Sequence, residues 1–348
     1  MNGFRTWLVC EPRYASLIEK ITIGDEFTLS TSDDPSFRHW CSTDGNAVTI
    51  IEQECSNEEE KMQAQNFVRA KEVIINCEKE ETADNFVSLI HAGILLGYPM
   101  NLNFHPISET CEVGYIKNEL LRKSPMHKWF TYHENVFYGC LLAKRAWRNP
   151  SVRYAMHKWR LSLDLDSFTP HSASPRQGQI FPTHYPDDTY HVKAAFAVIA
   201  AFSAIEELGL EVRSSAKKPR FVGDAKDQWN PDVFEDIEKR LREIGIDPSE
   251  KFEWVVRGQQ RTIENEFKPV LGKGSSWGND DDVRDRTLSI VDAIHYSSLV
   301  RNFIAAHKFS KFVGELGPYD VFNVQSIARR LIMSSLGVWM KGIDDIVN

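Results

Sequence analysis

The stretch Tyr190–Leu208, with the sequence YHVKAAFAVIAAFSAIEEL, indicates the fold of the second half of the chain. It is rich in alanine, the strongest helix former, and Gly209 follows directly as a helix stop. Apolar residues surround the expected helix almost completely, which is typical of a helix at the centre of a core. Its longest apolar part, Ala194–Ala204, is shorter than the about 20 residues that cross a bilayer. We therefore expect a buried helix and no membrane contact.

Further helices are expected on both sides of this stretch. Pro231–Ile244 has proline in its first turn and glycine directly after it, an arrangement that favours helix boundaries at these positions. The segment Arg286–Val313 is predicted as one long helix, and Val321–Met340 as the last one. Residues 186–348 are therefore predicted to form an all-α helical bundle. Upstream, helices are expected at Thr82–Leu96, Asn135–Trp147 and Val152–Leu165.

The first 80 residues favour β-strands, because β-branched and aromatic residues recur between turn-forming clusters. A helix is expected among these strands at Glu58–Ala70. The segment Ser167–Asp188 has four prolines and little apolar periodicity, so we place a domain boundary near residue 185. Residues 1–185 are thus predicted to form an α+β domain without an identified role. One hypothesis is a sensor or regulatory role. The expected strands are Phe4–Cys10, Ile21–Ser30, Ala47–Glu52 and Glu72–Asn76.

The charge balance argues against a protein that coats long nucleic acids. The 348 residues contain 41 Lys and Arg against 49 Asp and Glu, a net charge of -8, whereas such proteins are usually basic. An enzyme that contacts a few nucleotides through a local patch remains possible. The six cysteines form no CxxC pair, which favours reduced thiols, and the short apolar run near the N-terminus does not resemble a signal peptide. We therefore expect a cytoplasmic protein.

No common cofactor or metal motif is present, so we predict neither a cofactor nor a metal. The sequence lacks a phosphate-binding P-loop, a His-Glu-x-x-His zinc helix and a Gly-x-Ser-x-Gly nucleophile elbow. His127, His133 and Cys140 lie near one another but fit no usual zinc spacing. The acidic run Asp280–Asp282 with Asp285 is an alternative cation site, but carboxylates before a helix more often offset the helix dipole.

The segment Leu299–His307, LVRNFIAAH, is the most informative for chemistry. Arg301 and His307 interrupt an otherwise apolar part of the predicted long helix. Because an unpaired arginine is costly to bury, this turn of the helix should face a cleft or an interface. The alternative interpretation is a salt-bridged stripe on the protein surface.

Arg301-Asn302, four further residues and then His307 resemble the motif of the HEPN superfamily, which is Arg, a polar residue, a few variable residues and His. The surrounding helices are similar as well. HEPN domains begin with an apolar helix that often carries a glutamate near its end, as Glu206 and Glu207 do here, and they finish with another apolar helix. The resemblance covers about residues 187–348. The long stretch Val212–Asp285 departs from a minimal HEPN domain and resembles the larger abortive-infection type.

The resemblance implies a metal-independent endoribonuclease, a hydrolase acting in antiviral defence or as a toxin. In that chemistry the ribose 2′-hydroxyl attacks the adjacent phosphate and leaves a 2′,3′-cyclic phosphate. His307 would transfer protons, Arg301 would offset charge at the phosphorane, and Asn302 would orient either partner. On an ideal α-helix Arg301 and His307 are separated by roughly 9 Å along the axis and about 120° around it. The family's homodimer, which brings two motifs into one cleft, is therefore the implied assembly.

Basic residues near the motif are candidate RNA contacts. Lys308 and Lys311 follow it in the sequence, and a second basic loop precedes it by about eighty residues. For that loop a solvated surface is the alternative interpretation. Glu206 is a candidate partner of Arg301, either as a structural salt bridge or as a positioning group. The loop residues are Arg213, Lys217, Lys218 and Arg220.

RNA is the expected substrate, with tRNA among the candidate targets, and a phage-derived trigger or an antitoxin is the expected regulatory partner. A second hypothesis is a non-catalytic helical module for dimerisation or nucleotide binding, since the family also has inactive members. A third is an unrelated helical regulator in which the motif is accidental. Dimer formation through the motif helix would argue against the third hypothesis.

Overall fold

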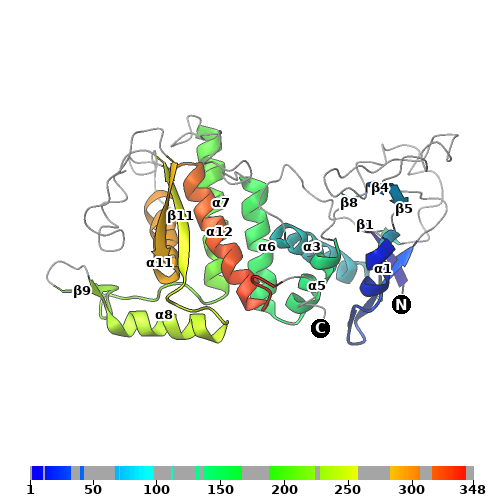
Figure 1. Ribbon diagram of the computed structural model, residues 1–348, viewed down its shortest axis with the longest axis horizontal. Helices are drawn as coiled ribbons and strands as arrows, with labels where there is room; N and C mark the ends of the chain where they lie inside the picture. The colour runs from blue at the N-terminus through cyan, green and yellow to red at the C-terminus, as the bar shows by residue number, and fades with distance from the viewer. Residues whose placement is uncertain are drawn as a thin grey trace. The chain divides into compact units, whose positions relative to one another are not determined.

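The computed structural model shows a mixed α/β protein (Figure 1). Its described residues fall into two compact units, residues 2–149 and residues 150–341. No described helix is both long enough and apolar enough to cross a membrane. The structure describes residues 2–10, 12–32, 40–42, 67–69, 71–97, 111–112, 131–132, 136–166, 188–223, 228–257, 283–305 and 316–341.

The first unit is built on a six-stranded sheet with the order β2-β3-β6-β1-β7, in which these neighbours are antiparallel and β8 pairs parallel with β1. A separate ribbon pairs β4 with β5. The strands of the sheet are β1 (Asn2–Cys10), β2 (Thr22–Ile23), β3 (Phe27–Ser32), β6 (Lys71–Cys77), β7 (Cys111–Glu112) and β8 (Thr131–Tyr132). The ribbon and the helices are β4 (Trp40–Ser42), β5 (Phe67–Arg69), α1 (Pro12–Ile18), α3 (Glu80–Gly97) and α5 (Val136–Trp147).

Close packing of α3 against α5 depends on two glycines. A Cβ atom added to Gly93 would lie 2.8 Å from the carbonyl oxygen of Gly139, and one added to Gly139 would lie 2.8 Å from the carbonyl oxygen of Ile90. Such distances are available only to residues without a side chain. On the sheet side of α3, the ring of Phe86 packs 4.2 Å from that of Phe27 on β3.

A buried ion pair joins the central strands of this sheet. Arg5 on β1 is 3% exposed, and its Nε donates to both carboxylate oxygens of Glu72 on β6 at 2.9 and 2.8 Å. The pairing of β1 with β6 is irregular between Arg5 and Val9, and the Thr6 hydroxyl donates to the Val73 carbonyl within that irregularity. The attraction between these opposite charges therefore offsets the hydration that each loses on burial.

The second unit combines helices with two antiparallel ribbons. The helices are α6 (Pro150–Leu165), α7 (Asp188–Glu207), α8 (Pro231–Glu243), α11 (Ile290–Leu299), the π-helix η3 (Val300–Ala305) and α12 (Pro318–Ser335). One ribbon pairs β9 (Phe221–Val222) with β10 (Gln228–Trp229), and the other pairs β11 (Lys251–Arg257) with β12 (Val283–Ser289).

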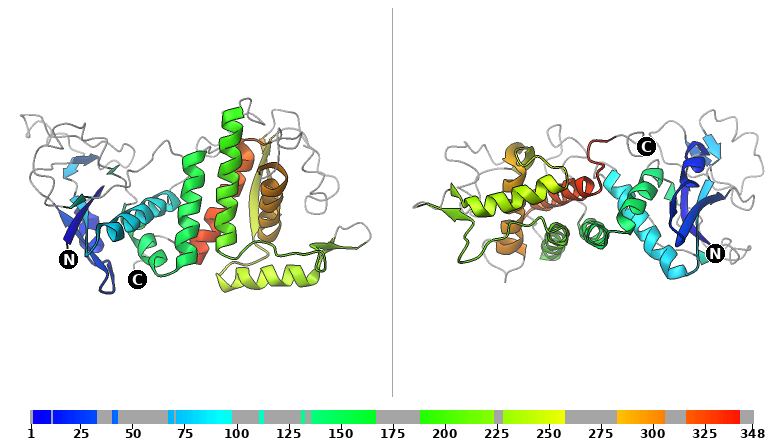
Figure 2. Two further views of the ribbon diagram at one scale, coloured as in Figure 1. Left: turned by 180° about the vertical axis from the view of Figure 1, so that it is seen from behind. Right: turned by 90° about the horizontal axis from the view of Figure 1, so that it is seen from below.

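Helix α7 occupies the centre of this unit, as its sequence predicts. It packs against α6, α12 and η3, and Figures 1 and 2 show α6, α7 and α12 side by side. The burial is less complete than its composition suggests. In its first half Tyr190, Val192 and Phe196 are 59%, 52% and 56% exposed. Only the second half of α7 is surrounded by other elements on most sides.

Polar side chains of α12 fix its neighbours in place. The Gln325 amide donates to the carbonyl oxygens of Ser162 and Asp166 at 3.1 and 2.7 Å, so it caps the C-terminal end of α6. The Asn323 amide accepts from the Val255 N–H at 2.9 Å and donates to the Val255 carbonyl at 2.7 Å. This pair of bonds satisfies the backbone of β11 on the side away from β12.

Several expected elements are confirmed. The helices at Thr82–Leu96, Tyr190–Leu208 and Pro231–Ile244 correspond to α3, α7 and α8, and the predicted strand Glu72–Asn76 is β6. Their apolar periods and end signals are local in sequence, which explains the agreement. The strand predicted at Ala47–Glu52 lies outside the described residues, as does nearly all of the linker predicted at Ser167–Asp188.

Other expectations are wrong. The second unit is not all-α, because it contains the β9–β10 and β11–β12 ribbons. The predicted helix Arg286–Val313 is a strand up to Ser289, whose hydroxyl caps α11 by accepting from the Asp292 N–H at 3.1 Å. The predicted helix Glu58–Ala70 contains the strand β5 at its end. The units divide after Asn149 rather than near residue 185, since α6 packs on α7 and α12.

Candidate functional site

The candidate catalytic arginine lies on a π-helical turn that continues α11 without a break. Within it, the Arg301 Nη1 donates to the Asn302 Oδ1 at 2.7 Å. The Arg301 Nη2 lies 4.0 Å from the Glu206 Oε1 at the end of α7, and these side chains are 35% and 39% exposed. The guanidinium is therefore oriented by two neighbours while part of it remains open to solvent. Single π-turns within helices frequently occur at functional sites.

The π-turn changes the helical geometry expected for the motif. A π-helix bonds residue i to i+5, so each turn contains more residues than an α-turn. Positions after Arg301 therefore project in other directions than the ideal α-helix predicts. The structure brings Arg301, Asn302 and Glu206 together. His307, Lys308 and Lys311 lie outside the described residues, so their placement stays a prediction.

A second polar cluster lies one turn earlier on the same helix, where α11 faces the β9–β10 ribbon. The Arg220 Nη1 donates to the His295 Nδ1 and to the Ser298 Oγ, each at 3.2 Å. Its Nε donates to the Ser214 Oγ at 2.9 Å. Of the four loop residues predicted to contact RNA, Arg220 is thus folded back onto α11.

Aromatic rings enclose this cluster. The His295 ring lies 5.2 Å from the Phe221 ring and 5.3 Å from the Trp229 ring, both in edge arrangements. The Trp229 indole N–H donates to the Asp292 Oδ1 at 3.1 Å, which anchors the ribbon to α11. Asp292, His295 and Ser298 recur every three residues along one stripe of the helix.

Burial and Arg220 determine the protonation of His295. Desolvation, followed by repulsion from Arg220, lowers the pKa of His295 to about 3. The imidazole is therefore neutral at pH 7, with Nδ1 accepting from Arg220 and the proton on Nε2. Burial also lowers the pKa of Arg220 and raises the pKa of Asp292, because each charged form is poorly solvated there.

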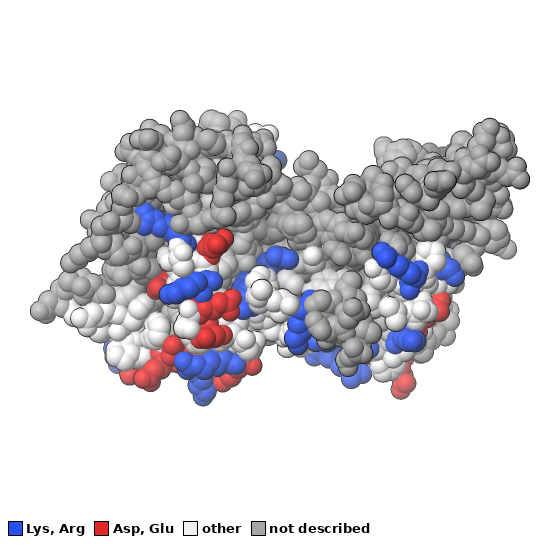
Figure 3. All heavy atoms as spheres, in the orientation of Figure 1, with Lys and Arg blue, Asp and Glu red and all other residues white. Residues whose placement is uncertain are grey.

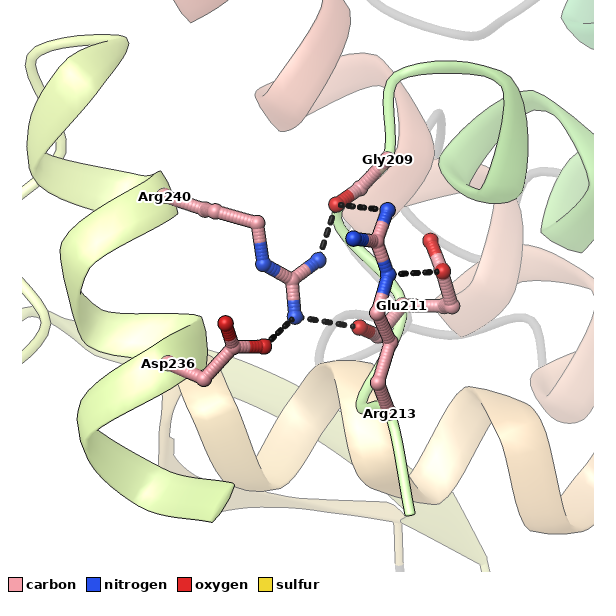
Figure 4. A network of polar contacts seen from close by, with 5 residues as sticks. All are labelled: Gly209, Glu211, Arg213, Asp236 and Arg240. Carbon is pink, nitrogen blue, oxygen red and sulfur yellow. Dashed lines mark hydrogen bonds and ion pairs between the residues drawn. The ribbon is translucent and has the colours of Figure 1, made fainter. Parts of the chain in front are cut away.

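The exposed Arg213 side chain has a carboxylate partner near the end of α7. Its Nε donates to the Glu211 Oε1 at 2.6 Å, a contact that raises the pKa of Arg213, and its Nη2 approaches the Gly209 carbonyl at 3.5 Å (Figure 4). Arg240 from α8 reaches the same carbonyl and also donates to the Asp236 Oδ2 at 2.8 Å. Both arginines therefore close the C-terminal end of α7, where Gly209 has a φ of 68°. The predicted RNA contacts Lys217 and Lys218 are exposed.

On the face shown in Figure 3, the charges over α8 are mixed. Figure 3 shows basic and acidic side chains intermingled over α8, where Arg242 lies 3.3 Å from Glu238. Arg330 on α12 is 4% exposed, and its Nη2 lies 2.6 Å from the Glu250 Oε2. Arg330 is thus a core residue whose charge is paired, and it does not add to the basic surface.

Within the described residues no group of three or more His, Cys, Asp and Glu side chains is placed to hold a metal ion. The alternative cation site at Asp280–Asp282 lies outside those residues, as do His127 and His133. Cys10, Cys77 and Cys140 are buried and are not joined in disulfide bonds. Burial raises the pKa of Cys140 far above its usual value, so it is an unreactive thiol.

No family model, no curated protein and no solved structure significantly matches this chain. The functional assignment therefore depends on the site itself. The sequence analysis missed His295, Ser298 and Trp229. For His295 and Ser298 the sequence offers one signal, which is their three-residue spacing with Asp292 before the motif. This spacing does not predict the contact with Arg220, because Arg220 is distant in sequence.

Proposed function

We propose that the protein is a metal-independent endoribonuclease that cleaves RNA by attack of the ribose 2′-hydroxyl. The observation that carries the proposal is the partly exposed Arg301 guanidinium, held by Asn302 at 2.7 Å and by Glu206 at 4.0 Å on a π-helical turn. A fixed guanidinium open on one side is suited to a phosphate, whose geometry its donors match. The resemblance of the Arg301–His307 motif to HEPN ribonucleases supplies the reaction.

In this mechanism Arg301 binds the scissile phosphate and offsets the charge that develops on the phosphorane. His307 transfers the proton from the 2′-hydroxyl or to the leaving 5′-oxygen, because imidazole titrates near neutrality. Asn302 keeps Arg301 oriented through the bond to its Nη1. The products are a 2′,3′-cyclic phosphate and a 5′-hydroxyl. We extend the proposal to a homodimer that acts in the cytoplasm, in phage defence or as a toxin.

The test is RNA cleavage by purified wild type, Arg301→Ala and His307→Ala in the presence of EDTA. Sequencing of the RNA ends should find cyclic phosphates with wild type but with neither Arg301→Ala nor His307→Ala. Arg242→Ala is the matched control, because it removes an exposed arginine that pairs with Glu238 on α8. Activity that EDTA abolishes and magnesium or zinc restores would contradict the mechanism. Full activity of His307→Ala would contradict the assignment of the motif.

The second candidate is a non-catalytic helical module that dimerises. It is favoured by the exposed apolar side chains of Tyr190, Val192 and Phe196 on α7 and of Tyr154 and Leu161 on α6. Light scattering together with the cleavage assay separates the candidates. A dimer in which neither wild type nor any variant cleaves RNA would favour this module over the ribonuclease.

A further inference from the structure

Arg220 differs from three other buried or half-buried arginines in its partners. Among the described residues it contacts only neutral acceptors, namely the Ser214 and Ser298 hydroxyls and the His295 ring. The three other arginines each bond a carboxylate. These pairs are Arg5 with Glu72, Arg240 with Asp236 and Arg330 with Glu250.

A half-buried cation without a counter-ion is costly, since its lost hydration is not offset by an opposite charge. The surroundings nevertheless hold it in one place. His295 and Ser298 are each 2% exposed, so the two acceptors of its Nη1 are fixed by the core of the unit. The Arg220 carbonyl in turn accepts from the Asn230 N–H at 2.8 Å, next to the β9–β10 ribbon. A cation that is firmly positioned but has no carboxylate among its described partners is a candidate for binding an anion.

The position of the cluster indicates which anion. Ser298 precedes Arg301 by three residues on the continuous α11–η3 helix, about 5 Å along its axis. The half-buried rings of Phe221 and Trp229 lie beside Arg220, 4.7 Å apart, and such rings offer faces on which a base stacks. A cation next to aromatic rings is typical of sites for single-stranded nucleic acids.

We propose that Arg220 binds a phosphate of single-stranded RNA next to the scissile one, with a base against Phe221 and Trp229. His295 and Ser298 are positioning residues that hold the Arg220 Nη1. The choice of RNA as the ligand rests on the proposed function. Binding at this subsite would determine which phosphodiester bond of the RNA lies at Arg301.

The test measures binding of a labelled single-stranded 2′-O-methyl RNA, which the proposed reaction does not cleave. Arg220→Gln should weaken binding by roughly 10- to 100-fold, the loss expected for a charge-assisted hydrogen bond. The slope of log Kd against log salt should fall by about 0.7, the value for one phosphate contact on a single strand. Arg242→Gln, the control variant, should change affinity less than twofold, because this arginine pairs with Glu238 on α8 and belongs to neither proposed site.

Thermal melting separates binding from structural roles. Arg220→Gln should leave the melting temperature unchanged or raise it, because it removes an uncompensated charge. Ser298→Ala should weaken RNA binding, and Ser298→Thr should retain it, since threonine keeps the hydroxyl that holds Arg220. A lowered melting temperature with unchanged RNA affinity for Arg220→Gln would overturn the proposal. Stabilisation by inorganic phosphate or anionic vesicles, without RNA binding, would also overturn it.

The subsite and the ribonuclease can fail separately. If His307→Ala cleaves RNA like wild type while Arg220→Gln loses binding, the catalytic proposal fails and the subsite stands. If the motif variants lose cleavage while Arg220→Gln binds the 2′-O-methyl RNA like wild type, the subsite fails and the ribonuclease stands.

Discussion

Glu206 contacts Arg301 either as a structural salt bridge or as a group that positions Arg301 for catalysis. Replacing Glu206 by glutamine distinguishes these two roles. The atoms are 4.0 Å apart and both side chains are more than a third exposed. Coulomb's law gives about 1 kcal/mol for this distance in water, and salt reduces it further. Exposed pairs of this kind typically contribute about 0.2–1 kcal/mol. Glu206→Gln should therefore lower the melting temperature by no more than about 2–4 °C in a unit of this size.

The effect on cleavage should be equally small. Asn302 still holds the Arg301 Nη1 at 2.7 Å in this variant, so the guanidinium keeps its main hydrogen bond. A loss of about 1 kcal/mol in transition-state stabilisation slows the reaction about fivefold. The assay is single-turnover cleavage of a defined RNA by wild type and Glu206→Gln, with melting curves recorded on the same samples. A loss of more than 100-fold with an unchanged melting temperature would refute this reasoning, because Glu206 would then take part in the chemistry itself.

Three further predictions concern the motif residues, the buried His295 and the Asn323 amide. Arg301→Ala should slow cleavage by about 10²–10³-fold and His307→Ala by about 10²–10⁴-fold, with a melting temperature lowered by no more than the about 2–4 °C expected for Glu206→Gln, and Asn302→Ala should be milder. His295→Gln should flatten the dependence of unfolding free energy on pH, measured by urea titration. A pKa of about 3 in the folded protein, below the usual 6.5, means that stability falls as pH drops from 6.5 towards 3, by up to about 1.4 kcal/mol per pH unit. Asn323→Leu should lower the unfolding free energy by about 2–5 kcal/mol in the same titration, because it leaves two buried backbone groups without partners; a loss below about 1 kcal/mol would show that water replaces the amide.

Local patterns in the sequence determined most of the helices. The period of apolar residues, Pro231 at a first helical turn and Gly209 and Gly245 after helix ends all act within a few residues, so one chain segment carries the whole signal. The same holds for the β-branched run that became β6. The Arg301-Asn302 motif was also visible from the sequence, as was Glu206 as its candidate partner, because polar residues interrupt an apolar helix there.

Tertiary structure determined the partner of each charged side chain and the boundary between the two units. Arg220 and Arg330 are the same residue type, yet Glu250 pairs with Arg330, whereas within the described part of the chain Arg220 bonds only neutral acceptors. The partner of a side chain comes from a distant segment, so local composition does not specify it. The β11–β12 ribbon and the assignment of α6 to the second unit likewise depend on contacts between residues far apart in the chain. Pairing and packing of this kind are properties of the folded chain, which is why the sequence indicated the helices but not their partners.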